Sequence, residues 1–222
     1  MKRLISLPVA ATLVGMLATP VTAQIVIQPE IGVNFANVTN GDQVFAEPGI
    51  TVDSKTRTGF VAGVGVLFAL SPRFGIGTGG YYSQQGVGLT LSDGASSADA
   101  TLELDYIQVP LTLGVSFPTS GAITPHLFAG PMIGFNATCK VSSSGSSEDC
   151  PSDTVNSTDV GVLFGGGLGF RAGTGMFVVN AYYDLGLTNV QKDAPSGSPT
   201  FNNRVFGFSV GYGFPLGGGG GM

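Results

Sequence analysis

The stretch Phe206-Gly207-Phe208-Ser209-Val210-Gly211-Tyr212-Gly213-Phe214 alternates without a break between large apolar residues and small ones. A period of two puts the large side chains on one face of a β-strand and glycine or serine on the other. The same period recurs over residues 60–68 and 177–185. The pattern predicts strands with two unlike faces, and it does not by itself say which face is buried.

Seven similar segments precede this one in the chain. The eight expected strands cover residues 25–37, 56–69, 73–90, 101–117, 122–137, 158–171, 175–190 and 203–214. Their connections alternate between long ones at 38–55, 91–100, 138–157 and 191–202 and short ones at 70–73, 118–121 and 172–174. Short turns at one rim and long loops at the other are typical of an outer-membrane barrel. We therefore expect an all-β fold, a closed eight-stranded antiparallel up-and-down transmembrane β-barrel.

Length and composition bound the domain organisation. The chain has 222 residues, of which 36 are glycine, and only 10% are charged, so it would form a poor water-exposed surface. Lys2 and Arg3, an apolar run too short to span a bilayer, and Val21-Thr22-Ala23 together match a secretory signal. We assign 1–23 to a signal peptide that is removed, 24–214 to the barrel and 215–222 to a Gly-rich C-terminal tail.

The placement of charge indicates which face of the strands meets lipid. Among the acids Glu30 and Asp184 fall well inside the expected strands, and among the bases Arg73 and Arg171 fall at strand ends. A soluble barrel with its apolar face inward would need charge on its outer face. Because the second face carries mostly Gly, Ser, Asn and Gln, we expect the apolar face to point outward into lipid.

Five ionisable residues share the polar face and are expected to point into the lumen as one polar cluster. They are Glu30, Arg73, His126, Arg171 and Asp184. Since an unpaired buried charge is costly, we expect Glu30 to bridge one or both arginines and to plug the lumen near the short turns. Asp184 is expected to be bound by neutral groups such as Asn180 or Gln108. Hydration of each charge by lumen water is the alternative.

The two cysteines, Cys139 and Cys150, lie in the same long connection. An exported protein meets an oxidising compartment, so we expect them to form a disulfide. No histidine lies nearby to complete a zinc site. The sequence therefore predicts no metal site and no cofactor.

Motifs that could carry chemistry are weak. Gly207-Phe208-Ser209-Val210-Gly211 matches the Gly-x-Ser-x-Gly motif of a nucleophile elbow. That motif needs a strand–turn–helix context and a histidine after the serine, whereas here it lies in a terminal strand and the single histidine, His126, precedes it. The acids of connection 91–100 and its flanks have no basic neighbour in the sequence and could bind divalent cations, although a solvated loop tip is the simpler interpretation. They are Asp93, Asp99, Glu103 and Asp105. We expect no enzymatic activity.

A resemblance supports the same architecture. The stretches Leu104-Asp105-Tyr106-Ile107-Gln108-Val109-Pro110-Leu111 and Pro125-His126-Leu127-Phe128-Ala129-Gly130-Pro131 resemble the middle of the small outer-membrane β-barrel family, of OmpX type and the OmpA barrel domain, often labelled porin-like. The resemblance covers roughly residues 24–214. It implies that Phe214 is the terminal aromatic recognised by the barrel-assembly machinery, although Pro215, Leu216 and a glycine run follow it. Deacylases of related barrels carry a serine two residues beyond their histidine, where this chain has Phe128.

These observations predict an integral protein of the outer membrane of a Gram-negative bacterium, exported through its signal peptide. We expect it to serve envelope integrity or surface contact through four long extracellular loops, without catalysis. A narrow porin-like channel is the alternative, and a soluble periplasmic ligand-binding barrel is a second one. The expected partners are outer-membrane lipid, lipopolysaccharide and the barrel-assembly machinery, with no nucleic acid and a monomeric state. The channel alternative rests on small residues expected to face inward, namely Gly63, Gly65, Gly165, Gly167, Gly211 and Gly213.

Overall fold

A computed structural model describes residues 24–44, 49–143, 145–151, 153–195 and 197–216. The expected signal peptide, 1–23, and residues 217–222 of the expected tail lie outside the described residues. No helix in the described part of the chain is long and apolar enough to cross a membrane.

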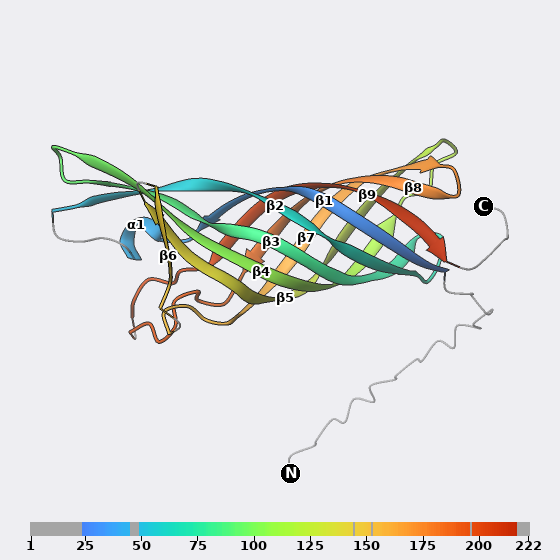
Figure 1. Ribbon diagram of the computed structural model, residues 1–222. Coiled ribbons are helices and arrows are strands. Elements are labelled where there is room, and N and C mark those ends of the chain that lie inside the picture. The colour runs from blue at the N-terminus through green and yellow to red at the C-terminus, as the bar shows by residue number, and fades with distance from the viewer. Residues whose placement is uncertain (1–23, 45–48, 144, 152, 196, 217–222) are drawn as a thin grey trace, which may run out of the picture.

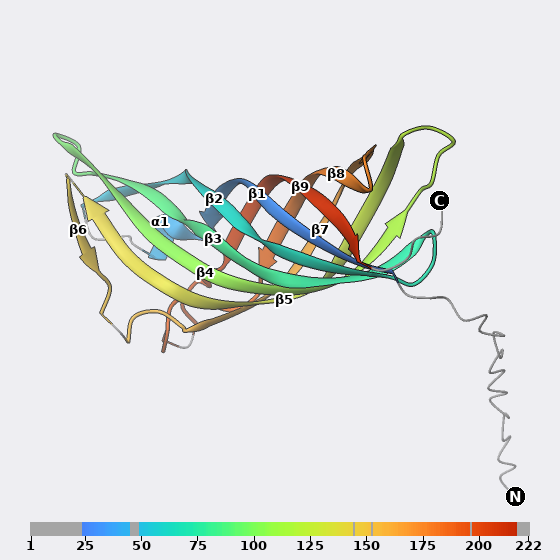
Figure 2. The same cartoon turned by 45° about the vertical axis from the view of Figure 1, so that its right-hand side comes forward.

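The described residues form one antiparallel sheet that closes into a barrel (Figures 1 and 2). Each ring strand pairs with its neighbours in chain order, and the ring closes because β1 pairs with both β2 and β9. The eight ring strands are β1 (Gln24–Val38), β2 (Thr51–Ala69), β3 (Phe74–Ser92), β4 (Ser97–Ser116), β5 (Ile123–Ser143), β7 (Thr158–Ala172), β8 (Gly175–Gly186) and β9 (Asn203–Leu216). A short helix, α1 (Gly41–Val44), follows β1, and β6 (Ser146–Asp149) pairs with β5 outside the ring. The expected fold class is confirmed.

The two ends of the barrel differ. At one end, here called the turn end, lie the three short turns, the start of β1 and the end of β9 (Figure 1). β9 continues to Leu216, beyond the expected boundary at 214, with Pro215 and Leu216 opposite Val26 and Ile25. β8 ends earlier than expected, at Gly186, which leaves 187–202 as a long connection at the other end.

At that other end four strands run past the ring and form a projecting sheet, here called the overhang (Figure 2). Pairing of β1 with β2 stops at Ala36 opposite Arg57, whereas β2 continues to pair with β3 as far as Thr51 opposite Ser92. The overhang comprises residues 51–56, 87–92, 97–103, 139–143 and 146–149.

The expected loop over 91–100 is wrong, because β3 and β4 extend through most of it and leave only the turn 93–96. The Asp93 carboxylate accepts hydrogen bonds from the backbone N–H groups of Ala95 (2.9 Å) and Ser96 (2.7 Å). The N–H groups of Ser96 and Ala95 hold the pKa of Asp93 below its ordinary value. Gly94 completes the turn with a φ of 87°, a conformation that glycine adopts without strain.

The faces of the ring strands are oriented as the charge argument predicts. Large apolar side chains point outward and are exposed, as for Ile31 (60%) and Val210 (53%). Their strand neighbours Asn34 and Ser209 point inward and are buried. An apolar exterior around a polar interior is the arrangement of a barrel whose outer solvent is lipid.

Candidate functional site

The middle of the lumen is organised around Glu30. Its Oε1 accepts hydrogen bonds from Gln28 Nε2 (3.0 Å) and the Tyr81 hydroxyl (3.1 Å). Its Oε2 accepts from Asn180 Nδ2 (3.1 Å) and the Ser209 hydroxyl (2.7 Å). Neutral donors thus satisfy both carboxylate oxygens inside the barrel.

The expected bridge from Glu30 to an arginine is wrong. Arg73 lies in the exposed turn before β3, and Arg171 is exposed near the end of β7. Among the described residues, the ion pairs involve neither of these arginines nor Glu30. Both guanidinium groups lie at the turn end, where water can solvate them, so the lumen cluster does not include them.

His126 does point into the lumen, where it is part of the same network. Its Nε2 lies 2.8 Å from Asn180 Oδ1, and Asn180 in turn donates to Glu30. The imidazole stacks on the ring of Phe128, with centroids 6.3 Å apart. His126 thus has an amide and a phenyl ring as its neighbours in the lumen.

Asp184 lies nearer the overhang end and is bound by amides. Gln108 Nε2 donates to its Oδ2 at 2.7 Å, as the sequence led us to expect, and Gln85 Nε2 lies 3.4 Å from the same oxygen. Asn180, the other expected partner, bonds Glu30 instead. Asp184 is therefore held by neutral groups.

Sequence reasoning missed a second buried acid, Asp159. Asn203 Nδ2 donates to Asp159 Oδ2 (2.8 Å) and to the Tyr106 hydroxyl oxygen (3.2 Å). Asp159 stands one residue inside β7, next to the long connection that precedes the strand. Asp159 lies two residues before Gly161 and so shares its face of the strand, and this spacing was the signal that could have predicted a lumen position.

Above this polar layer the overhang end of the lumen is filled by apolar side chains, here called the apolar cap. Connection 187–202 contributes two of them, and strands β1 to β4 contribute the rest. The apolar cap consists of Val38, Val52, Val87, Leu89, Leu102, Leu104, Tyr106, Val190 and Phe201. Hydrogen bonds fix the connection in place, including Val190 N–H to Phe201 O (2.7 Å) and Thr39 N–H to Asn202 O (2.9 Å).

The inward glycines that favoured a channel are covered by large side chains. A Cβ on Gly63 would lie 2.5 Å from the Tyr81 ring, and one on Gly165 would lie 2.8 Å from the Phe128 ring. A Cβ on Gly207 would overlap the Tyr182 ring. The glycines make room for aromatic side chains that fill the lumen.

The outer face of the overhang, together with the wall just below it, carries the charges that the sequence left unpaired. Arg57 bridges Glu103 (3.3 Å) and Asp105 (3.4 Å), and the Tyr82 hydroxyl donates to Asp105 at 2.5 Å. The expectation of no basic partner is wrong for Asp99, Glu103 and Asp105, because pairing of β2, β3 and β4 brings the bases alongside. Asp99 likewise pairs with Lys55 at 3.5 Å.

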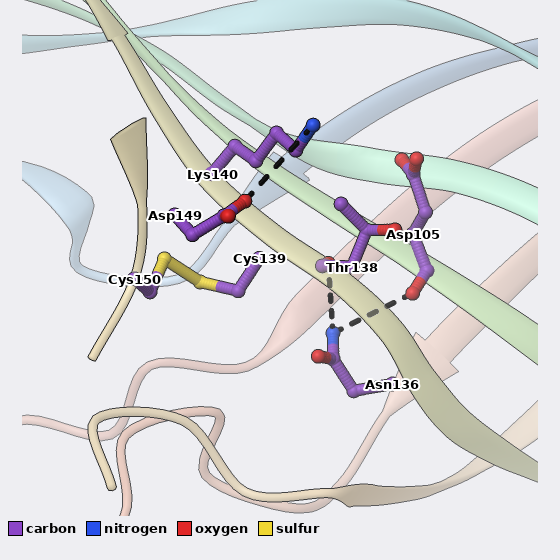
Figure 3. The surroundings of a disulfide bond; sticks show 7 residues. All are labelled: Asp105, Asn136, Thr138, Cys139, Lys140, Asp149 and Cys150. Carbon is purple, nitrogen blue, oxygen red and sulfur yellow. Dashed lines mark hydrogen bonds and ion pairs between the residues drawn. A yellow bond between two sulfur atoms is a disulfide. The ribbon is translucent and has the colours of Figure 1, made fainter. Parts of the chain in front are cut away.

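Figure 3 shows the disulfide that joins Cys139 of β5 to Cys150, just after β6. The Cys150 N–H also donates to the Cys139 carbonyl oxygen (2.9 Å), and Lys140 lies 4.0 Å from Asp149 beside the bond. Both cysteines pack against the apolar cap. The bond therefore ties the β5–β6 corner of the overhang to the end of the barrel.

Comparison with known proteins identifies the class of barrel. The family model described as "Outer membrane protein beta-barrel domain" matches residues 21–192. Among curated proteins, none matches the chain. The outer membrane protein OprG from Pseudomonas aeruginosa is similar in structure, with a TM-score of 0.51 and 11% identity, over 88% of this chain and 97% of that chain.

Two further solved structures align over similar lengths. Ail, the attachment invasion locus protein of Yersinia pestis, gives a TM-score of 0.38 at 19% identity, over 86% of this chain and 98% of that one. The outer membrane protease OmpT from Escherichia coli gives 0.39 at 11% identity, over 91% and 99%. At these identities the likeness concerns the fold alone.

Proposed function

The chain belongs to the family of outer membrane protein beta-barrel domains, and from this premise we propose that it is a non-conducting, non-catalytic surface protein. Membership assigns the chain to the outer membrane of a Gram-negative bacterium, so the soluble periplasmic alternative is set aside. In such barrels short turns face the periplasm and long connections face outward, which makes the overhang end the extracellular end.

The observation that carries the proposal is the filled lumen. The apolar cap occupies the overhang end, and the network around Glu30 occupies the middle. An eight-stranded barrel has an interior just wide enough for side chains, and here aromatic rings cover the glycines that would otherwise widen it. Passage of a solute would require the cap and the network to open together.

The overhang supports a role in surface contact. It projects beyond the ring, and its outer face carries paired charges of both signs, including Arg57 with Glu103 and Lys55 with Asp99. Hydrogen bonding between strands stiffens it, and a stiff contact surface loses little conformational entropy on binding. We propose that lipopolysaccharide surrounds the wall below it, that the barrel-assembly machinery inserts the chain, and that the protein is a monomer.

Planar-bilayer recording tests the closed lumen. The purified full chain should give no steady unitary conductance, whereas a double variant Tyr81→Gly/Tyr182→Gly, which removes two lumen rings, should give measurable leak. A trimeric porin in the same bilayers serves as the positive control. Discrete steady channels from the unchanged chain would favour the narrow-channel alternative.

Shortening the overhang tests the contact role. Replacing residues 90–99 by Asn-Gly joins Leu89 to Ala100, which already face each other in the ladder, through a two-residue hairpin turn. Cells carrying this variant should adhere less to host or abiotic surfaces but keep their detergent resistance. Alanine substitution of Pro118 and Ser120, at the opposite end, is the control. Unchanged adhesion with lost detergent resistance would instead favour envelope integrity as the role.

A further inference from the structure

Two carboxyl groups lie deep in the lumen without forming an ion pair in the described part of the chain. Asp159 and Asp184 are 4% and 3% exposed, and the ion pairs of the described residues involve neither. An unpaired buried carboxylate costs several kcal/mol of solvation, on the order of the whole net stability of a domain. Something must therefore balance their charge in the folded protein.

Both carboxyl groups approach the same pair of glycines. Gly161 of β7 and Gly186 of β8 are register partners. A Cβ on Gly161 would lie 3.3 Å from Asp184 Oδ1, and a Cβ on Gly186 would lie 3.0 Å from Asp159 Oδ2. Since facing positions in a ladder are only about 4.5–5.5 Å apart, the two carboxyl groups approach one glycine pair, which has no side chain of its own.

Four oxygen atoms at this level lack a hydrogen-bond partner in the described residues. They are Asp159 Oδ1, Asp184 Oδ1, Gln85 Oε1 and Asn203 Oδ1. Gln85 and Asn203 are each 1% exposed, and their nitrogen atoms are already used. Gln85 Nε2 donates toward Ser83 and Asp184, and Asn203 Nδ2 donates to Tyr106 and Asp159. Buried acceptor oxygens normally have a partner. Four unpartnered oxygens at one level of the lumen therefore indicate that a partner binds there.

Arg204 is the basic side chain beside the site, but it does not supply that partner. Its Nη1 donates to the carbonyl oxygens of Gly186 (2.7 Å) and Asn203 (2.8 Å). Its neighbours in β9, Asn203 and Val205, are buried on the lumen side. Because side chains alternate along a strand, the Arg204 side chain projects from the outer face. The lumen side therefore keeps two carboxylates and two amide oxygens whose unpartnered atoms are buried, with Gln85 bonded to Asp184 and Asn203 to Asp159.

We propose that these oxygens hold a calcium ion inside the barrel. Calcium prefers carboxylate and amide oxygens, and two carboxylates balance its charge. No group of three or more His, Cys, Asp and Glu side chains in the described residues has a metal-binding arrangement, so this ligand set depends on the amides of Gln85 and Asn203. The ion would tie β3, β7, β8 and β9 together directly below the apolar cap.

Metal content of the full chain tests the proposal. Protein refolded with calcium chloride and then passed through chelator-treated buffer should retain about one calcium per chain. Asp184→Asn and Asp159→Asn, which keep the side-chain shape, should lose it. Glu30→Gln should retain it, because Glu30 is a lumen carboxylate whose two oxygens both have hydrogen-bond donors. Retention of magnesium in place of calcium would overturn the assignment.

A second measurement does not depend on how well the variants fold. A closed barrel stays folded in detergent until it is heated, so unboiled and boiled protein are expected to run as different bands on a gel. For the unchanged chain, the temperature at which the folded band converts to the denatured band should rise with calcium and fall after chelation. Absence of both bound ion and calcium dependence in the unchanged chain would overturn the site. An Asp184→Asn variant that is more stable than the unchanged chain would also overturn the site. That result would mean that protons, and not calcium, neutralise the two acids. Neither readout involves conductance or adhesion, so this result is separable from the proposed function.

Discussion

At the scale of single residues, strand parity predicted the inward direction of three of the five ionisable residues but failed for Arg73 and Arg171, and it did not predict which side chains meet. Glu30, His126 and Asp184 point inward as expected, because alternation along a strand fixes the face. The partner of Glu30 could not be predicted, because it depends on how far each strand is staggered against its neighbours. That stagger leaves Arg73 and Arg171 at the exposed turn end.

We expect Glu30→Gln to destabilise the barrel by about 1–3 kcal/mol, because an amide nitrogen would face donors that now meet a carboxylate oxygen. The midpoint of urea unfolding in detergent, followed by the loss of the unboiled gel band, measures the effect. Glu103→Gln is the control, since Glu103 makes a partly exposed ion pair with Arg57 and should cost less than about 1 kcal/mol. Equal losses of unfolding free energy in the two variants would show that the lumen network contributes little to stability.

We expect Gly207→Ala to cost about 1–3 kcal/mol, because its Cβ would overlap the ring of Tyr182. The overlap predicts strong coupling to that ring. In a double-mutant cycle with Tyr182→Ala, the double variant should lose less unfolding free energy than the two single variants lose together. Simple additivity would contradict the close packing of this pair.

At the scale of elements, the positions of the strands could be predicted, but one end of each of β2, β4, β5 and β8 was misplaced by four to six residues. Val87, Leu89 and Leu91 alternate with smaller residues along β3, and the strand runs on to Ser92, two residues past its expected end at 90. The acids of 93–105 looked like a solvated loop because the bases that pair with them, Lys55 and Arg57, lie on a different strand. Such pairing across strands is invisible until the register is known.

The β5–β6 corner should be separable from the barrel. Peptide mass analysis without reduction should find Cys139 linked to Cys150, and Cys139→Ser/Cys150→Ser should leave the strand content and the unboiled gel band in place. The bond closes a short loop and stabilises it by on the order of 3 kcal/mol in the chain-entropy model, which acts locally on the corner. Proteolysis within 144–157 should therefore speed up after reduction. Loss of the folded band on reduction would mean that the corner supports the whole ring.

At the scale of the whole molecule, the unlike ends fix an orientation that trypsin can test on intact cells. Lys192 is exposed in connection 187–202, whereas Arg73 and Arg171 lie at the turn end. Cleavage after Lys192 should occur in intact cells, and cleavage after either arginine should require opened cells. A periplasmic protein that stays whole is the control for leakage. Cleavage after Arg73 in intact cells would invert the orientation.

The closure of the ring between its first and last strands has a consequence for how the chain folds. Glu30 of β1 lies opposite Gly211 of β9, almost the full length of the barrel sequence later. Until β9 has been synthesised, β1 and β8 each present an unpaired edge, and such edges pair with other chains. Contacts this distant in sequence also form slowly. The nascent chain must therefore travel unfolded across the periplasm, shielded from its own copies, and a chain cut short before β9 is expected to aggregate rather than to insert.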